Sequence, residues 1–178
     1  MLSKVKILAI AGIGGFGGLC GQAVEGEELP HNTDRPFDQS AGELGLNIFG
    51  FSIHTDRSAG HNEVNPGVGL RYVFSQPAPR WALFGEASTY YDSNREWAKY
   101  VALGTSYRFA PAWSVGAAVA YGQSQGSNNG KPFFALVPGL AFEYRKVVIN
   151  AVLLPSENAD SKIAGLAFYV TIPLGHRD

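Results

Sequence analysis

Beyond residue 43, apolar residues alternate with polar or small ones in short segments. Eight such segments of about ten residues are separated by polar or proline-containing turns. A period of two is typical of β-strands whose two faces meet different environments. The pattern therefore predicts an all-β chain with strands at about residues 44–54, 66–75, 80–91, 97–109, 112–122, 132–144, 146–154 and 162–174.

The two faces of these strands differ in side-chain size. In the last segment, Leu166 and Phe168 alternate with Gly165 and Ala167. One face is large and apolar and the other is small, as expected for a lipid-facing wall around a crowded barrel interior. A soluble sandwich or a lipocalin-like barrel also suits eight strands, but the continuous apolar outer face disfavours both.

The connections between the strands alternate in length. Those after the odd-numbered strands, 55–65, 92–96, 123–131 and 155–161, are polar and mostly long, whereas the others are short. Long and short loops alternate in this way in outer-membrane barrels, where the short turns are periplasmic. We therefore expect an eight-stranded antiparallel transmembrane β-barrel of the outer-membrane type.

The first residues have the composition of an export signal rather than of a membrane anchor. Lys4 and Lys6 precede an apolar, glycine-rich stretch, and Gly21-Gln22-Ala23 fits a small-x-small cleavage site. The single cysteine, Cys20, lies within this signal, so the mature chain would have no thiol chemistry. The predicted division is a signal peptide at 1–23, a polar N-terminal segment at 24–43 and the barrel at 44–178.

Composition narrows the range of partners. The 178 residues carry a formal net charge of -1 and only 16% charged side chains, which argues for one domain and against a nucleic-acid partner. No cluster of cysteine, histidine and carboxylate residues has the spacing of a metal site. We therefore predict neither a metal nor an organic cofactor, and we interpret His31, His61 and His176 as solvated loop or tail residues.

The small-residue face also carries charges. Arg71, Glu86, Arg108 and Glu143 all fall on it, and buried charges need partners. We predict that these four form a network that closes the lower barrel. Nearer the other end, the sixth segment points apolar residues inward, which suits an acyl chain better than water: Phe133, Ala135, Val137 and Gly139.

Three polar residues could carry chemistry at the rim with the long loops. His54 ends the first segment, and Asp92 and Ser93 lie at the tip of the second hairpin. In a narrow barrel, rim residues from different hairpins can converge. A histidine could then accept a hydroxyl proton, a carboxylate could orient it, and a serine could bind an oxyanion or attack. Solvated surface residues of the same types are the alternative.

The order of several residues resembles the lipid A palmitoyltransferase family. The motif runs from Asp92-Ser93 to Trp97, with Gly104 further along the same strand. His54 lies near the end of the first strand, Asn62-Glu63 is followed by Pro66, and Pro138 and Pro155 keep the family's separation. The resemblance extends over most of the mature chain, although Phe49 stands near the place of the family's first gate proline.

The resemblance implies an activity and a role for each of these residues. The activity would be transfer of a palmitoyl chain from the sn-1 position of a glycerophospholipid to a hydroxyacyl chain of lipid A, in the outer membrane. His54, Asp92 and Ser93 would be the essential polar residues, with His54 as the general base. Gly104 would form the floor that sets acyl-chain length. The lateral gates for the two lipids would be marked by Pro66, Pro138 and Pro155.

Two other functions remain open. A lipid A deacylase on a similar barrel would hydrolyse an ester with serine, histidine and a carboxylate. A non-enzymatic barrel for adhesion or membrane structure would make the rim residues incidental. For the transferase, the expected partners are lipid A and a glycerophospholipid of the outer membrane, and we expect a monomer.

Overall fold

The computed structural model describes residues 41–55, 60–124, 130–155 and 163–175. The predicted signal peptide, almost all of the polar segment, His31 and His176 lie outside these residues. None of the helices in the described part is long and apolar enough to cross a membrane.

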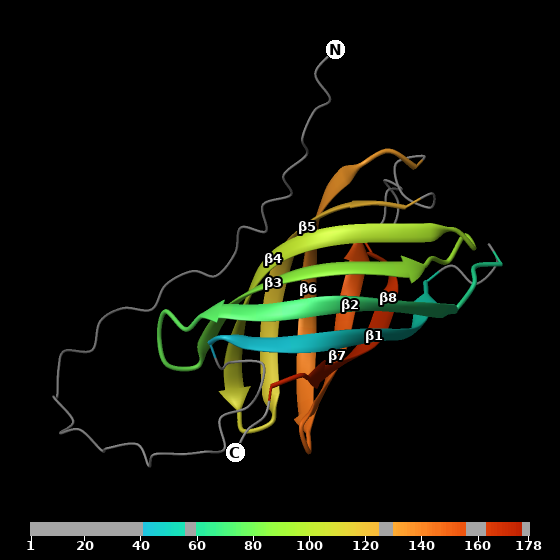
Figure 1. Cartoon of the computed structure of the whole chain (residues 1–178). Helices are drawn as coiled ribbons and strands as arrows, with labels where there is room; N and C mark the ends of the chain where they lie inside the picture. The colour runs from blue at the N-terminus through green and yellow to red at the C-terminus, as the bar shows by residue number, and fades with distance from the viewer. Residues whose placement is uncertain (1–40, 56–59, 125–129, 156–162, 176–178) are drawn as a thin grey trace, which may run out of the picture. The chain divides into compact units, whose positions relative to one another are not determined.

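The described residues form eight strands, labelled in Figure 1. Each begins and ends within two or three residues of the alternating segment that predicts it. The strands are β1 (Glu43–His54), β2 (Val64–Ser75), β3 (Trp81–Tyr91), β4 (Trp97–Ala110), β5 (Trp113–Gln123), β6 (Phe133–Tyr144), β7 (Val147–Pro155) and β8 (Ile163–Pro173).

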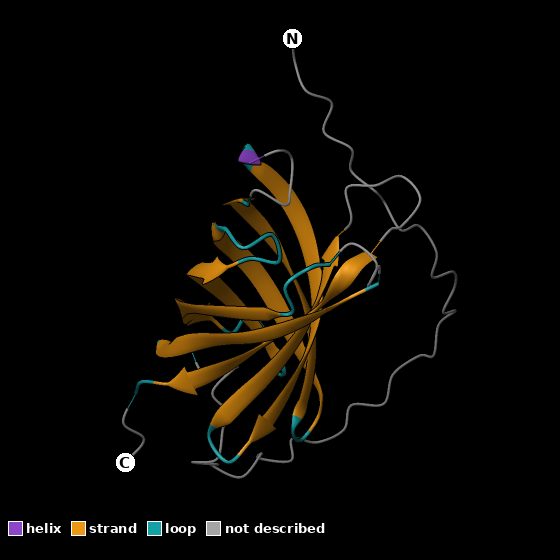
Figure 2. Ribbon diagram, turned by 90° about the vertical axis from the view of Figure 1, so that its right-hand side faces the viewer, coloured by secondary structure: helices purple, strands orange, loops and turns teal. Residues whose placement is uncertain are grey.

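The strands close into a barrel in chain order. Every neighbouring pair is antiparallel, and β1 also pairs with β8, so the sheet is continuous around the ring (Figure 2). Closure satisfies the backbone hydrogen-bonding groups of both edge strands. The predicted fold class, an eight-stranded antiparallel barrel of the outer-membrane type, is confirmed.

The outer surface is apolar along the whole length of the strands. Leu103 is 67% exposed and Phe134 is 70% exposed. Most of the other strands also expose aliphatic side chains. Aromatic side chains gather toward the short turns, where Trp81 packs at a tilt against Tyr107, and Trp113 does the same against Phe142 across the ladder. An apolar band with aromatic side chains near its end is typical of a barrel that spans a lipid bilayer.

The four charges predicted to face inward are found in the lumen. They form two ion pairs: Arg71 Nη1 lies 3.2 Å from Glu86 Oε1, and Arg108 Nη2 lies 3.0 Å from Glu143 Oε2. The second pair joins the short-turn ends of β4 and β6, whereas the first lies deeper in the lumen. Of the predicted network, the described residues therefore show two ion pairs, on different parts of the wall.

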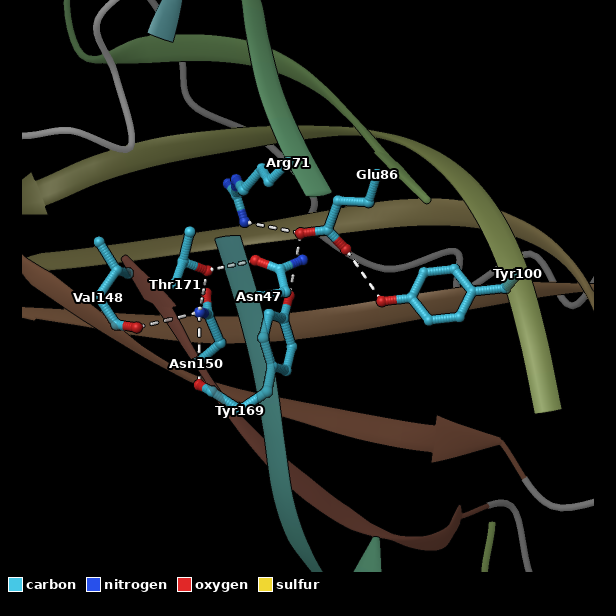
Figure 3. Close-up of polar contacts among 8 residues, drawn as sticks. All are labelled: Asn47, Arg71, Glu86, Tyr100, Val148, Asn150, Tyr169 and Thr171. Atoms are coloured by element: carbon cyan, nitrogen blue, oxygen red, sulfur yellow. Dashed lines mark hydrogen bonds and ion pairs between the residues drawn. The ribbon is translucent and has the colours of Figure 1, made fainter. Parts of the chain in front are cut away.

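Glu86 is the centre of a polar cluster in the lumen (Figure 3). Tyr100 Oη and Tyr169 Oη each donate to its carboxylate over 3.2 Å, on the same group that Arg71 pairs with. Phe49 stacks on Tyr169 with ring centroids 4.9 Å apart. Polar and aromatic side chains from β1, β2, β3, β4 and β8 therefore fill this half of the lumen.

The opposite half of the inner wall is built from small residues. Between Gly116 and Gly122 of β5, and between Ala135 and Ala141 of β6, the inward positions are alanine, glycine or valine, and those nearer the long loops remain partly accessible: Ala118, Ala120, Gly122, Ala135, Val137 and Gly139. Inward residues of β3 such as Ala82 and Phe84 are instead buried. The expected apolar upper lumen is thus found, but on one side of the barrel only.

Candidate functional site

An irregularity in β1 turns His54 toward the lumen. The register of β1 with both neighbours shifts between Phe49 and Phe51, so Gly50 is the extra residue of a bulge against β8. A bulge reverses which side chains face inward. Asn47 faces inward before it, and Ser52 and His54 face inward after it, all three buried. Uninterrupted alternation from Asn47 would have put His54 on the lipid side.

His54 is covered by the loop that follows it. The ring of the loop residue His61 stacks on the His54 ring with centroids 4.6 Å apart, and His54 is the last residue of β1, at the rim with the long loops. Burial lowers the pKa of His54, the charge of His61 lowers it further, and Glu63 opposes both. Among the described residues, the buried Nδ1 of His54 has no hydrogen-bond partner. At neutral pH this imidazole is therefore uncharged and able to accept a proton.

Asp92 is buried at the start of the β3–β4 hairpin, 4% exposed. Its Oδ1 accepts hydrogen bonds from the backbone N–H of Asn94 (2.8 Å) and of Glu96 (3.0 Å). Its Oδ2 accepts from the hydroxyl of Ser124, at the end of β5, over 2.6 Å. In the described part of the chain, the Asp92 carboxylate is therefore bonded to its own hairpin and to β5.

Ser93 lies at the hairpin tip and is half-buried. Its carbonyl oxygen accepts a hydrogen bond from the backbone N–H of Asn62 over 2.9 Å. Asn62 follows His61, whose ring covers His54. The β1–β2 loop thus joins the His54 corner of the rim to Ser93, so the three predicted polar residues lie on adjoining parts of the same rim.

The β1–β2 seam near Pro66 is closed by side chains. The ladder shifts register beside Pro66, whose own side chain is exposed. On the inner side, the Ser52 hydroxyl donates to Asn65 Oδ1 over 2.6 Å, and Asn65 Nδ2 donates to the Tyr91 carbonyl over 3.2 Å. These two bonds connect β1, β2 and β3 where the regular ladder fails.

The β6–β7 seam is different. In the described residues, the two strands pair only from Tyr144 with Val147 up to Gly139 with Val152. Pro138 follows at once, and the rest of β6 pairs with β5 alone while β7 continues with β8 up to Pro155. In Figure 1, the upper part of β6 bends away from the end of β7. The accessible small residues described above lie just inside this seam.

Gly104 faces the lumen, as expected, beside buried Ala102 and Ser106. A Cβ there would lie 2.4 Å from Cζ of Phe84, so the phenylalanine ring occupies the space that the glycine leaves. The Arg71 guanidinium covers this ring at 3.7 Å from its centroid. The Phe84 ring therefore lies against Gly104 and fills this part of the lumen.

Sequence reasoning did not identify Ser124, Asn65 or Ser52. A signal existed for Ser124, because it continues the inward parity of β5 beyond Gly122. Asn65 and Ser52 had no such signal, since the irregular register beside Pro66 decides which way they face. No group of three or more histidine, cysteine or acidic residues that could hold a metal ion occurs among the described residues.

No family model matches this chain, and no curated protein matches it. Among solved structures, the chain is similar to the Yersinia pestis outer membrane protein Ail, whose backbone structure was obtained in a phospholipid bilayer nanodisc. The identity is 17%, the TM-score is 0.45, and the alignment covers 75% of this chain and 99% of Ail.

Proposed function

We propose that this barrel is an outer-membrane acyltransferase that moves a palmitoyl chain from a glycerophospholipid to lipid A. One observation carries the proposal: an accessible wall of small residues lies inside a lateral seam that is unpaired above Gly139. Such a wall suits an acyl chain, which could enter from the bilayer through the seam without leaving an apolar environment.

The polar residues of the rim supply groups that transfer requires. An uncharged His54 accepts the proton of the acceptor hydroxyl, whose oxygen attacks the carbonyl carbon of the sn-1 ester. The bond from that carbon to the glycerol oxygen then breaks, and the proton passes from His54 to this oxygen. The products are a lysophospholipid and acylated lipid A, with no net gain or loss of protons. In this proposal the Ser93 hydroxyl donates a hydrogen bond to the carbonyl oxygen as negative charge develops there.

A non-enzymatic structural or adhesion barrel is the second candidate. The observation that favours it is the saturation of Asp92, whose carboxylate accepts two backbone bonds and one from Ser124. A carboxylate with this set of partners also serves as a hairpin cap without any catalysis. Lipid A deacylation would use the same rim residues, with water in place of the acceptor hydroxyl.

The test is mass spectrometry of lipid A from Gram-negative cells that express the chain, under membrane stress. We expect wild type to add the mass of one palmitoyl group, and His54→Ala and Ser93→Ala to lose this addition while still reaching the outer membrane. The matched control is Ser114→Ala, which changes a buried serine at the short-turn end of β5.

Two results would contradict the proposed activity, and a third would contradict its mechanism. Loss of an acyl chain from lipid A would indicate the deacylase. Unchanged lipid A would favour the structural barrel. Equal activity in wild type and in both rim variants would keep a transferase but remove His54 and Ser93 from its mechanism.

A further inference from the structure

We infer that Ser124 is a positioning residue that fixes the orientation of the Asp92 carboxylate at the rim. The hydroxyl of Ser124 donates to Asp92 Oδ2 over 2.6 Å, and both residues are buried, at 8% and 4% exposure. The two are far apart in sequence and come from different hairpins. The role of this bond in catalysis rests on the proposed transferase function, whereas its role in holding the carboxylate does not.

The register of the barrel explains how the two residues meet. Tyr90 of β3 pairs with Ala98 of β4, and Lys99 of β4 pairs with Gln123 of β5. The next inward positions are therefore Asp92 beyond Tyr90, and Ser124 opposite Ala98. Ala98 is 1% exposed, and alanine has the smallest side chain after glycine. Its size leaves room for Asp92 to reach β5 across β4.

The second carboxylate oxygen is the one that needs an external partner. Both backbone donors from the hairpin, Asn94 and Glu96, bind the same oxygen, Oδ1. The terminal torsion of an aspartate is broad, so bonds to one oxygen leave the plane of the carboxylate poorly fixed. The bond from Ser124 to Oδ2 removes this freedom. It also ties the β3–β4 hairpin to the end of β5, which the hairpin's own bonds cannot do.

A positioning role predicts a specific kinetic signature. Removing the hydroxyl in Ser124→Ala leaves the substrate-binding wall intact but lets the carboxylate rotate. We expect kcat for palmitoyl transfer to fall about tenfold to a hundredfold with KM nearly unchanged, because misplacement of a polar group costs rate rather than binding. Ser124→Thr keeps the hydroxyl and restores kcat. Ser114→Ala, a buried serine on the same face of β5, leaves kcat unchanged.

Amide hydrogen exchange of the intact barrel in bilayer nanodiscs tests the bond independently of activity. We expect the backbone N–H groups of Asn94 and Glu96 to exchange faster in Ser124→Ala than in wild type, and at the wild-type rate in Ser124→Thr. If these amides exchange faster while wild type itself transfers no acyl chain, Ser124 holds Asp92 and the proposed function fails. If their exchange is unchanged in Ser124→Ala, the inference is overturned, whatever happens to kcat.

Discussion

Two seams of this barrel carry a proline, yet among the described residues only the one beside Pro138 loses its strand pairing altogether. At Pro66 the β1–β2 ladder shifts register, but Ser52 and Asn65 join the strands from inside. At Pro138 the β6–β7 ladder ends, and the inward residues beside it are small and apolar. Proline removes a ladder hydrogen bond in both places. Whether a gap results depends on the side chains that face it.

The difference concerns what each seam can do in a membrane. Unpaired backbone groups in a bilayer are costly, so a seam persists only where side chains, ligands or water satisfy them. The β1–β2 seam is satisfied by a buried serine and a buried asparagine, which adds polar groups to its inner side. The β6–β7 seam faces alanine, valine and glycine, so under the proposed function an acyl chain would pass there without breaking side-chain hydrogen bonds like those of Ser52 and Asn65.

The largest effect is expected from closing the open seam. Continuing the register of Gly139 with Val152 by two residues on each strand places Val137 opposite Leu154, both inward. Bridging Val137→Cys to Leu154→Cys with a disulfide or a short bifunctional thiol reagent should reduce palmitoyl transfer to background. Cleaving the bridge with a reductant should restore it, as measured by lipid A mass spectrometry.

A second bridge on the same seam provides the control. Leu140 pairs with Ala151 within the ladder that already exists, so Leu140→Cys bridged to Ala151→Cys adds a covalent bond without closing anything. Transfer should then stay at the wild-type level. Equal transfer in the Val137–Leu154 bridged and reduced forms would show that acyl chains do not enter between β6 and β7.

The fold could be predicted from sequence because period-two alternation continues through nearly every strand. The strand bounds, the closed topology and the inward direction of Gly104 all follow from parity. Parity fails wherever the register shifts. At Gly50 the bulge moves His54 from the outer face to the inner one, and beside Pro66 it brings Asn65 against Ser52. A single extra residue leaves no trace in a hydrophobic pattern.

The candidate site was predicted less completely, for a related reason. Its residues could be named one at a time, but their partners come from strands distant in sequence. Ser124 reaches Asp92 only because Ala98 between them is small. The predicted floor at Gly104 is filled by a phenylalanine from the neighbouring strand. These contacts depend on which side chains fill a shared space, and no local pattern reports that.

A smaller effect is expected from weakening the closed seam. Asn65→Ala removes the acceptor for the buried Ser52 hydroxyl and one donor to the part-buried Tyr91 carbonyl. The free energy of unfolding should fall by about 1–3 kcal/mol, the usual cost of such groups. Amide exchange should rise at Ser52, whose N–H is bonded to the Glu63 carbonyl. Ser52→Ala, which removes one bond only, should have a smaller effect on both measurements.

An Asn65→Ala barrel with wild-type stability and wild-type exchange at Ser52 would contradict the difference between the two seams. In that case the bonds inside the β1–β2 seam would contribute nothing, and both seams would be equally free to open. On the β6–β7 side, amide exchange can be measured on the wild-type barrel, because the ladder there already ends at Gly139.

The smallest effect concerns the depth of the lumen behind the open seam. The register connects Phe84 with Gly104, Gly104 with Ala118 and Ala118 with Val137, so the Phe84 ring lies on the same row as the first inward-facing residue of the unpaired part of β6. A chain entering there would end against Phe84. The new Cβ of Gly104→Ala would lie 2.4 Å from its ring and 2.9 Å from a backbone oxygen of Ala117.

The ring in Gly104→Ala must therefore move, while Phe84→Leu shortens it. We expect Gly104→Ala to shift donor preference toward chains shorter than palmitoyl, and to cost about 1–3 kcal/mol of stability from overpacking. Phe84→Leu should shift preference toward longer chains. Donor mixtures of graded chain length, with products separated by mass, measure both shifts. Opposite shifts would identify the Phe84–Gly104 contact as the floor, whereas identical preferences in all three proteins would mean that the acyl chain stops before reaching it.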